Sequence, residues 1–230
     1  MDKEKALQDK ISGYKKVLVA FSGGVDSTFL LYMCKKVLGE ENVLAVTVLG
    51  SSFPTREKDS ATELAREIGV RHLFVESNEY DVPEFSQNGP DRCYYCKRGE
   101  FSKLIKLAEE NGIETVVDGS NRDDKSDYRP GRRAIRELGI ESPLSDLTKS
   151  EIRDLCKKYS LRVFDKPSYA CLASRVPYGH TITPELLSKI EKAENFLMDS
   201  GFLDVRVRDY GDLARIEVSK SEFEKLIVHV

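Results

Sequence analysis

The stretch Phe-Ser-Gly-Gly-Val-Asp-Ser at residues 21–27 decides the fold prediction, because it lies directly between an apolar run and an amphipathic one. Paired glycines let a backbone approach an anion and expose successive N–H groups to it, and a following helix adds the positive end of its dipole. The candidate anion-binding residues are Ser22, Gly23, Gly24 and Ser27. Asp26 would repel a bare phosphate, so its expected partner is a Mg²⁺ ion that bridges phosphate oxygens. The alternative is a tight turn capped by Asp26.

Apolar runs rich in valine alternate with segments of helical spacing along the chain around this loop. Strands are predicted at residues 15–21, 43–49, 71–75 and 114–118, and helices at 26–38, 57–68 and 100–111. Strands that alternate with helices form right-handed βαβ units and a parallel sheet covered on both faces. We therefore predict an α/β fold with a parallel, doubly wound sheet in a domain over about residues 1–165.

A smaller α+β domain is predicted at residues 166–230. Its first part, residues 167–179, has little periodicity and two prolines, which indicates a loop or linker. After it we predict an amphipathic helix at 183–200, hairpin strands at 204–208 and 214–218, and a helical segment at 219–230. The chain ends inside that apolar segment, so we expect that further residues can follow it.

Composition argues against several classes of function. The 230 residues include 36 Lys and Arg and 39 Asp and Glu, a formal net charge of −3 that argues against a general nucleic-acid-binding surface. No run approaches the roughly 18 apolar residues of a membrane span, and the charged first residues do not resemble a secretory signal. We therefore expect a cytoplasmic protein. Its five cysteines, an odd number, favour metal, redox or sulfur chemistry over a disulfide framework.

Three of these cysteines form a candidate metal or sulfur site. Cys93 and Cys96 make a C-x-x-C motif within Arg-Cys-Tyr-Tyr-Cys-Lys, and Cys171 lies within Pro-Ser-Tyr-Ala-Cys-Leu-Ala-Ser-Arg. We expect Arg175 to lower the pKa of Cys171. Three thiolates could hold three irons of a [4Fe–4S] cluster and leave the fourth iron open, or could bind zinc with a water. A redox pair and two plain surface cysteines are the other interpretations of the motif, and the last two cysteines are expected in the core: Cys34 and Cys156.

The Ser-Gly-Gly-Val-Asp-Ser string resembles the signature of the PP-loop ATP pyrophosphatases. It lacks the G-x-G-x-x-G and G-K-[ST] patterns of dinucleotide-binding and P-loop proteins. The resemblance implies an adenine-nucleotide α-hydrolase-like sheet that binds ATP at the carboxyl ends of its strands, adenylates a substrate oxygen and releases pyrophosphate. By the same resemblance, Val48 and Ser51 line the adenine.

A second polar stretch, Asp-Gly-Ser-Asn-Arg-Asp-Asp at residues 118–124, follows the fourth predicted strand. It is similar to the G-[ST]-x-x-D-D element of the same superfamily. The resemblance implies that Gly119 contributes to the nucleotide site and that Asp123 or Asp124 shares the Mg²⁺ with Asp26. A polar turn is the alternative.

The chain resembles the LarE family over nearly its whole length. The resemblance lies in the two cysteine motifs, in the glycine loop and in Val-Arg-Val-Arg-Asp-Tyr-Gly-Asp-Leu-Ala-Arg-Ile-Glu-Val at residues 205–218. Members of this family are ATP-dependent sulfur transferases of nickel-pincer cofactor biosynthesis, commonly hexameric. They adenylate a carboxylate of a pyridinium dicarboxylate mononucleotide and convert it to a thiocarboxylate. In one variant the cysteine that matches Cys171 gives up its own sulfur; in the other, three cysteines hold a [4Fe–4S] cluster. The C-x-x-C motif favours the cluster variant here.

The substrate phosphate requires cations, and two arginines two residues apart on one face of a predicted strand fit that requirement. The candidate phosphate-site residues and their partners are Ser174, Arg175, Arg206, Arg208, Glu194 and Glu217. Glu217 on the opposite hairpin strand is expected to orient the arginines. Solvated surface charge is the alternative for each.

Three rival functions remain open. A tRNA thiolase shares the ATP loop, but it normally needs an extended basic surface that a net charge of −3 does not offer. A nucleotide-binding regulator would sense ATP without chemistry. An amidotransferase-type synthetase would need an ammonia source, for which the sequence shows no motif.

Overall fold

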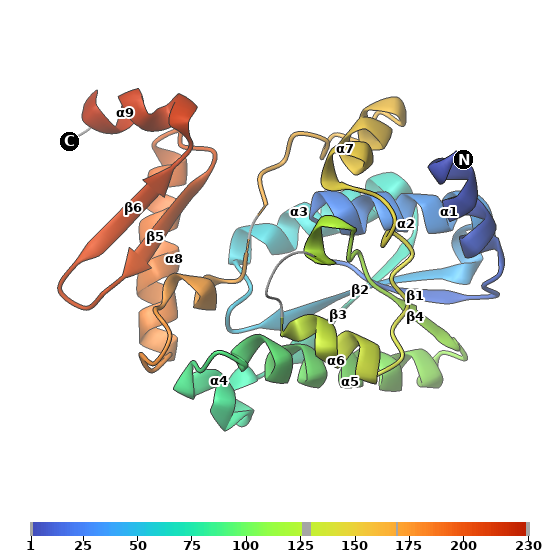
Figure 1. Ribbon diagram of the computed structural model, residues 1–230, viewed down its shortest axis with the longest axis horizontal. Helices are drawn as coiled ribbons and strands as arrows, with labels where there is room; N and C mark the ends of the chain where they lie inside the picture. Colours follow the sequence, from blue (N-terminus) through green and yellow to red (C-terminus); the bar gives the residue numbers. More distant parts are fainter. Residues whose placement is uncertain (1, 126–129, 169, 229–230) are drawn as a thin grey trace.

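A parallel sheet forms the centre of the computed structural model, which describes residues 2–125, 130–168 and 170–228. In this part of the chain the sheet has four strands in the order β3-β2-β1-β4 (Figure 1). Their bounds are β1 Val17–Ala20, β2 Val43–Gly50, β3 Arg71–Ser77 and β4 Thr115–Val117. The sequence places β2 on one side of β1 and β4 on the other, which creates the switch point where α/β sheets bind ligands beyond the carboxyl ends of their strands.

Helices cover both faces of this sheet, because successive side chains of β1 point to opposite sides. Val17 and Val19 pack in the core under the upper helices, whereas Leu18 packs in the core above the lower ones (Figure 1). The upper helices are α1 Lys3–Ser12, α2 Val25–Leu38, α3 Thr55–Ile68 and α7 Lys149–Lys158. The lower helices are α5 Arg92–Glu110 and α6 Gly131–Glu137. The predicted α/β fold with a parallel, doubly wound sheet is confirmed.

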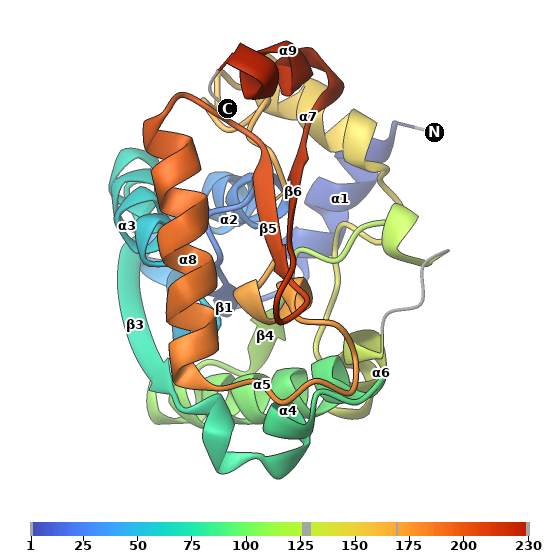
Figure 2. The same ribbon diagram turned by 90° about the vertical axis from the view of Figure 1, so that its left-hand side faces the viewer.

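The C-terminal part contains the predicted antiparallel hairpin, which lies along one long helix (Figure 2). Its elements are α8 Pro184–Asp199, β5 Val205–Asp209, β6 Ala214–Val218 and α9 Phe223–Val228. The helix predicted at 219–230 therefore begins later, and its last two residues lie outside the described part. A third core joins Leu172 and Ile190 of this region to Phe85 in the short helix α4 (Pro83–Gln87).

The structure differs from the prediction most clearly at α5. The predicted helix begins at residue 100, whereas α5 begins at Arg92 and includes Cys93 and Cys96 in its first turns. Gly99 and two adjacent tyrosines weaken the helical pattern there. The short helices α4 and α6 and the charged α1 are also additions to the predicted elements. Among the described residues, no helix is long and apolar enough to cross a bilayer.

Candidate active site

A cleft of about 930 Å³ opens beyond the carboxyl ends of β1, β2 and β4. Its walls combine the phosphate loop after β1, the loop after β4, a face of α5 and the segment that leads to Cys171. The predicted site residues on its walls are Ser22, Gly24, Asp26, Ser27, Val48, Gly119, Asp123, Asp124, Cys171 and Arg206. The cleft thus brings the nucleotide loop and the sulfur-bearing segment into a shared space.

The phosphate loop is held by its own hydroxyl groups. The Ser22 and Ser27 hydroxyl oxygens are 3.1 Å apart, and the Gly24 amide donates to the Ser22 hydroxyl at 3.4 Å. Gly23 has φ of +71°, in the left-handed region that glycine favours. The loop after β4 lies close beside it, because a Cβ at Gly119 would lie 3.0 Å from the Ser27 amide nitrogen. Glycine at 23 therefore permits the turn of the phosphate loop, and glycine at 119 permits the close approach of the loop after β4.

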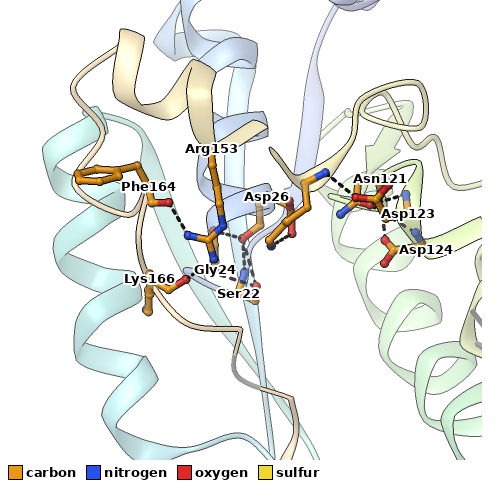
Figure 3. Close-up of polar contacts among 11 residues, drawn as sticks. Ser22, Gly24, Asp26, Asn121, Asp123, Asp124, Arg153, Phe164 and Lys166 are labelled. Carbon is orange, nitrogen blue, oxygen red and sulfur yellow. Dashed lines mark hydrogen bonds and ion pairs between the residues drawn. The ribbon is translucent and has the colours of Figure 1, made fainter. Parts of the chain in front are cut away.

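Asp26 has the geometry of an incomplete cation site. One carboxylate oxygen pairs with Lys149, while the other, Oδ1, is buried and has no hydrogen-bond partner among the described residues. Asp123 and Asp124 line the same cleft, and Asp123 accepts a hydrogen bond from the Lys149 amide at 2.8 Å (Figure 3). A buried carboxylate oxygen without a partner is costly unless a cation binds it. Carboxylates beside a phosphate loop have the chemistry that Mg²⁺ prefers, but in the described part of the chain these three side chains are not arranged as a set of ligands.

Of the two residues predicted to line the adenine, one lies on the cleft wall and the other does not. Val48 borders the cleft, whereas Ser51 is exposed and Ser52 takes its place on the cleft wall. The Ser52 hydroxyl donates to the buried carboxyl of Glu79 at 2.5 Å. Burial raises the pKa of Glu79 above its ordinary value, although the Ser52 hydrogen bond opposes this shift.

The three candidate thiols come from two segments. Cys93 and Cys96 lie in the first turns of α5, and Cys171 immediately precedes the 3₁₀ turn Leu172–Arg175. The Arg92 guanidinium contacts the Cys93 sulfur at 3.7 Å. Among the described residues, no three His, Cys, Asp or Glu side chains are arranged to hold a metal ion. The donor set has the chemistry of an iron–sulfur site, but the thiols are not in ligating positions.

Cys171 is an exposed residue on the cleft wall. The protein around its thiol keeps water away from the sulfur, and this desolvation raises the pKa of Cys171 above the ordinary value. The positive charges of Arg92 and Lys97 oppose that shift. Burial also raises the pKa of Cys96, and the nearby Glu100 carboxylate adds to the effect. The expectation that Arg175 lowers the Cys171 pKa is wrong, because its guanidinium contacts the carbonyl oxygen of Cys171, at 3.3 Å, and points into the core.

Arg175 and Glu194 form a buried ion pair. They are 1% and 3% exposed, and two hydrogen bonds of 2.8 and 3.0 Å join the guanidinium to the carboxylate. Arg175 also donates to the Ala170 carbonyl, and Glu194 accepts the Val207 amide of β5 at 2.9 Å. The Arg175 guanidinium and the Glu194 carboxylate, predicted to lie at the substrate phosphate site, are thus hydrogen-bonded to other protein groups. In this arrangement the pair joins α8, β5 and the Cys171 segment.

The two hairpin arginines have different surroundings. Arg206 reaches the cleft wall and donates to the Ser168 carbonyl at 3.3 Å. Arg208 donates to Glu217 at 2.8 Å and to the Ser174 carbonyl at 3.0 Å. Arg206 is therefore the cleft-lining member of the predicted phosphate pair, and Arg208 links the hairpin to the turn after Cys171.

Several charged residues of the cleft are missing from the sequence prediction. They include Glu57, Glu79, Lys97, Glu100, Lys149 and Lys166. Lys97 and Glu100 form an ion pair of 2.8 Å on the helix face that follows the C-x-x-C motif. Lys97 follows Cys93 by four residues and Glu100 follows Cys96 by four residues, a helical spacing that an earlier helix start would have made visible.

Comparison with known proteins identifies the family. The NAD synthase family model matches residues 2–93. The chain is 36% identical over 228 residues to pyridinium-3,5-bisthiocarboxylic acid mononucleotide synthase of Lactiplantibacillus plantarum, across 98% of this chain and 83% of the relative. It is 40% identical over 217 residues to an uncharacterised protein of Synechocystis, across 94% and 81% of the two chains. A tRNA-specific 2-thiouridylase of Clostridioides difficile is 23% identical over 227 residues, across 81% of this chain and 62% of the relative.

The phosphate loop, the cleft beside it and the identity along nearly the whole chain agree with one another. This ATP-dependent PP-loop enzyme belongs to the LarE family of PP-loop ATP pyrophosphatases.

Proposed function

We propose that this enzyme adenylates a carboxylate of a pyridinium dicarboxylate mononucleotide and converts it to a thiocarboxylate in nickel-pincer cofactor biosynthesis. The observation that carries the proposal is the shared cleft, which the phosphate loop and Cys171 both line. The Lactiplantibacillus relative is named a pyridinium-3,5-bisthiocarboxylic acid mononucleotide synthase, and this name supports the substrate class.

The chemistry explains why both groups must meet in this cleft. A carboxylate is a poor acyl donor, so its oxygen first attacks the α-phosphorus of ATP and pyrophosphate leaves. A sulfur nucleophile then attacks the acyl carbon, and AMP leaves with the former carboxylate oxygen. We assign Asp26 and Asp124, with Asp123 beside them, to Mg²⁺, which would neutralise charge on the departing pyrophosphate. Ser22, Gly24 and the helix start behind them would hold the phosphates.

The substrate site is proposed on the C-terminal side of the cleft. Arg206 would contact the substrate phosphate, since it is the hairpin arginine on the cleft wall. Arg208 and Glu217 would keep the hairpin against Ser174. In this scheme residues 1–165 bind ATP and residues 166–230 bind the substrate and deliver sulfur. We also expect a homo-oligomer, because the hairpin region exposes large apolar side chains: Leu213, Ile216 and Phe223.

The sulfur source is proposed to be a [4Fe–4S] cluster held by Cys93, Cys96 and Cys171. When bound, such a cluster would supply an open iron able to carry an extra sulfide. The positive charges of Arg92 and Lys97 would favour the thiolate form of Cys171. Ligation requires the thiols to move from their described positions. The alternative is that Cys171 donates its own sulfur.

Substrate-dependent pyrophosphate release tests the adenylation step. Protein purified without oxygen is mixed with Mg-ATP and the pyridinium dicarboxylate mononucleotide, and the product is examined by mass spectrometry. We expect pyrophosphate release and exchange of an oxygen for a sulfur. Asp26→Asn should abolish both, while the exposed control Asp81→Asn should retain them. Pyrophosphate release with tRNA and none with the pyridinium substrate would support the thiolase instead.

Metal analysis of the same anaerobic protein tests the sulfur source. Iron and sulfide at about four of each per chain are expected from the cubane stoichiometry. Cys93→Ala should abolish both signals, whereas Cys34→Ala, in the buried core, should leave them. A colourless protein whose Cys171 loses its sulfur after one turnover would replace the cluster proposal with the sacrificial route.

A further inference from the structure

Lys166 connects the phosphate loop to the segment that carries Cys171. Its ammonium group donates to the Gly23 carbonyl at 3.1 Å, to the Glu57 carboxylate at 2.7 Å and to the Ser60 hydroxyl at 3.0 Å. The side chain is only 16% exposed. An ammonium has three N–H donors, so these contacts can use all of them. Lys166 is therefore held in a fixed position against the phosphate loop.

The hydrogen bond from Lys166 to the Gly23 carbonyl oxygen determines the orientation of the peptide group between Gly23 and Gly24. In a trans peptide the carbonyl and the N–H point in opposite directions. Because Lys166 binds the Gly23 carbonyl oxygen, the Gly24 N–H of that peptide faces away from Lys166, and Gly24 lines the cleft. A carbonyl oxygen turned the other way would repel a phosphate. The lysine thus fixes the orientation of this peptide, whose Gly24 N–H donates to the Ser22 hydroxyl, and the φ of +71° at Gly23 permits the turn.

The backbone around Lys166 is attached to the rest of the enzyme on both sides. Arg153 of α7 donates to the carbonyl oxygens of Phe164 and Lys166, the latter at 2.8 Å (Figure 3). On the far side of Cys171, the Leu172 amide donates to the Ser52 carbonyl at 2.9 Å. Within the short segment that carries Cys171, Arg206 also donates to the Ser168 carbonyl, and Arg175 donates to the Ala170 and Cys171 carbonyls. A shift of the phosphate loop that moves Lys166 is expected to move this segment.

We propose that Lys166 is a positioning residue that couples nucleotide binding at the phosphate loop to the position of Cys171. Phosphate binding would fix the loop amides, and through the Gly23 carbonyl it would fix Lys166 and the segment that leads to Cys171. The inference rests on the proposed function for one point, which is the role of Cys171 in sulfur delivery. The coupling itself requires ATP binding alone.

Two measurements on the full-length chain test the coupling. The first is the affinity for Mg²⁺ and a non-hydrolysable ATP analogue, measured by calorimetry. The second is the alkylation rate of Cys171 with and without that analogue, followed by mass spectrometry of the peptide that contains it. In the unaltered enzyme we expect the analogue to change the Cys171 rate several-fold. Lys166→Met should weaken analogue binding about tenfold, as expected for loss of a charge-assisted hydrogen bond, and remove the analogue's effect on Cys171.

Matched variants separate this role from a general loss of structure. Lys166→Arg keeps the charge and should restore part of the analogue's effect. Lys189→Met removes an exposed lysine that pairs with Asp209 and should behave as the unaltered enzyme. If Lys166→Met does not fold, Glu57→Gln weakens the same anchor and should reduce the effect of the analogue on Cys171.

The coupling would be overturned if Cys171 reacts equally with and without the analogue in the unaltered enzyme. It would also be overturned if Lys166→Met retains the full effect of the analogue. Neither measurement uses the pyridinium substrate or requires sulfur transfer. Failure of substrate-dependent pyrophosphate release would therefore refute the proposed function and leave these results unaffected.

Discussion

Glu194→Ala tests whether the Arg175–Glu194 pair stabilises the fold or serves the substrate. The substitution would leave the Arg175 guanidinium, 1% exposed, without its carboxylate partner. It would also remove the acceptor of the Val207 amide in β5. Two elements that hold the Cys171 segment in place would lose a buried contact.

The cost follows from burial. Breaking a buried ion pair from one side costs about 3–5 kcal/mol, because the remaining charge stays buried without an opposite charge. The Arg208–Glu217 pair has similar chemistry but its side chains are 29% and 31% exposed. Such partly exposed pairs contribute about 0–1 kcal/mol. Glu194→Ala should therefore lower the free energy of unfolding several times more than Glu217→Ala.

Urea unfolding followed by circular dichroism measures the difference. With a slope of about 2 kcal/mol per molar urea, Glu194→Ala should lower the midpoint by about 1.5–2.5 M. The double variant Arg175→Met with Glu194→Leu should recover much of the loss, because apolar groups of similar volume can replace a buried pair. Equal midpoints for Glu194→Ala and Glu217→Ala would refute this reasoning. Combined with a loss of substrate affinity, that result would return Glu194 to the substrate site.

Two further predictions concern the cleft. Gly119→Ala would place a Cβ 3.0 Å from the Ser27 amide nitrogen of the phosphate loop. Overpacking of this kind costs about 1–3 kcal/mol, so ATP binding measured by calorimetry should weaken as the two loops move apart. Gly89→Ala, where a Cβ meets nothing within 4 Å, should have no effect. The pKa of Cys171 is raised by its surroundings and lowered by Lys97, so Lys97→Met should raise it further. The alkylation rate of Cys171 at pH 8 should then fall and its pH profile should move to higher pH, because the thiolate is the reactive form; an unchanged profile, or the same shift in Lys103→Met, would contradict this assignment.

Local patterns were sufficient to predict the sheet and the phosphate loop. The valine-rich strands and the paired glycines at 23–24 are contiguous in sequence, and their conformations depend on neighbouring residues. The carboxyl ends of β1 and β4 lie at the same edge of a parallel sheet, so the placement of Asp26 and Asp124 on the walls of one cleft also follows from topology. These features required no knowledge of side-chain packing.

Burial of charge could not be predicted in the same way. The sequence predicts a substrate-phosphate contact for both Arg175 and Arg206, yet Arg175 is buried against Glu194 and Arg206 reaches the cleft. The difference depends on where α8 packs, which no local pattern specifies. Lys166 was missed for the same reason, because its partners Gly23 and Glu57 are far away in the sequence.

The protonation of the thiols restricts when sulfur can react in this cleft. A thiol whose pKa is raised remains mostly protonated at neutral pH and is a poor nucleophile. Cys96 and Cys171 both have raised pKa values, and the nearby positive charges that oppose the shift at Cys171 come from Arg92 and Lys97. Formation of thiolates therefore requires added positive charge, such as a bound metal would supply. The proposed acyl-adenylate reacts with water, so it is best used where sulfur is already activated. We therefore expect the cysteines to be loaded before ATP is consumed, and we expect enzyme whose cysteines carry no metal to form little thiocarboxylate for the pyrophosphate that it releases.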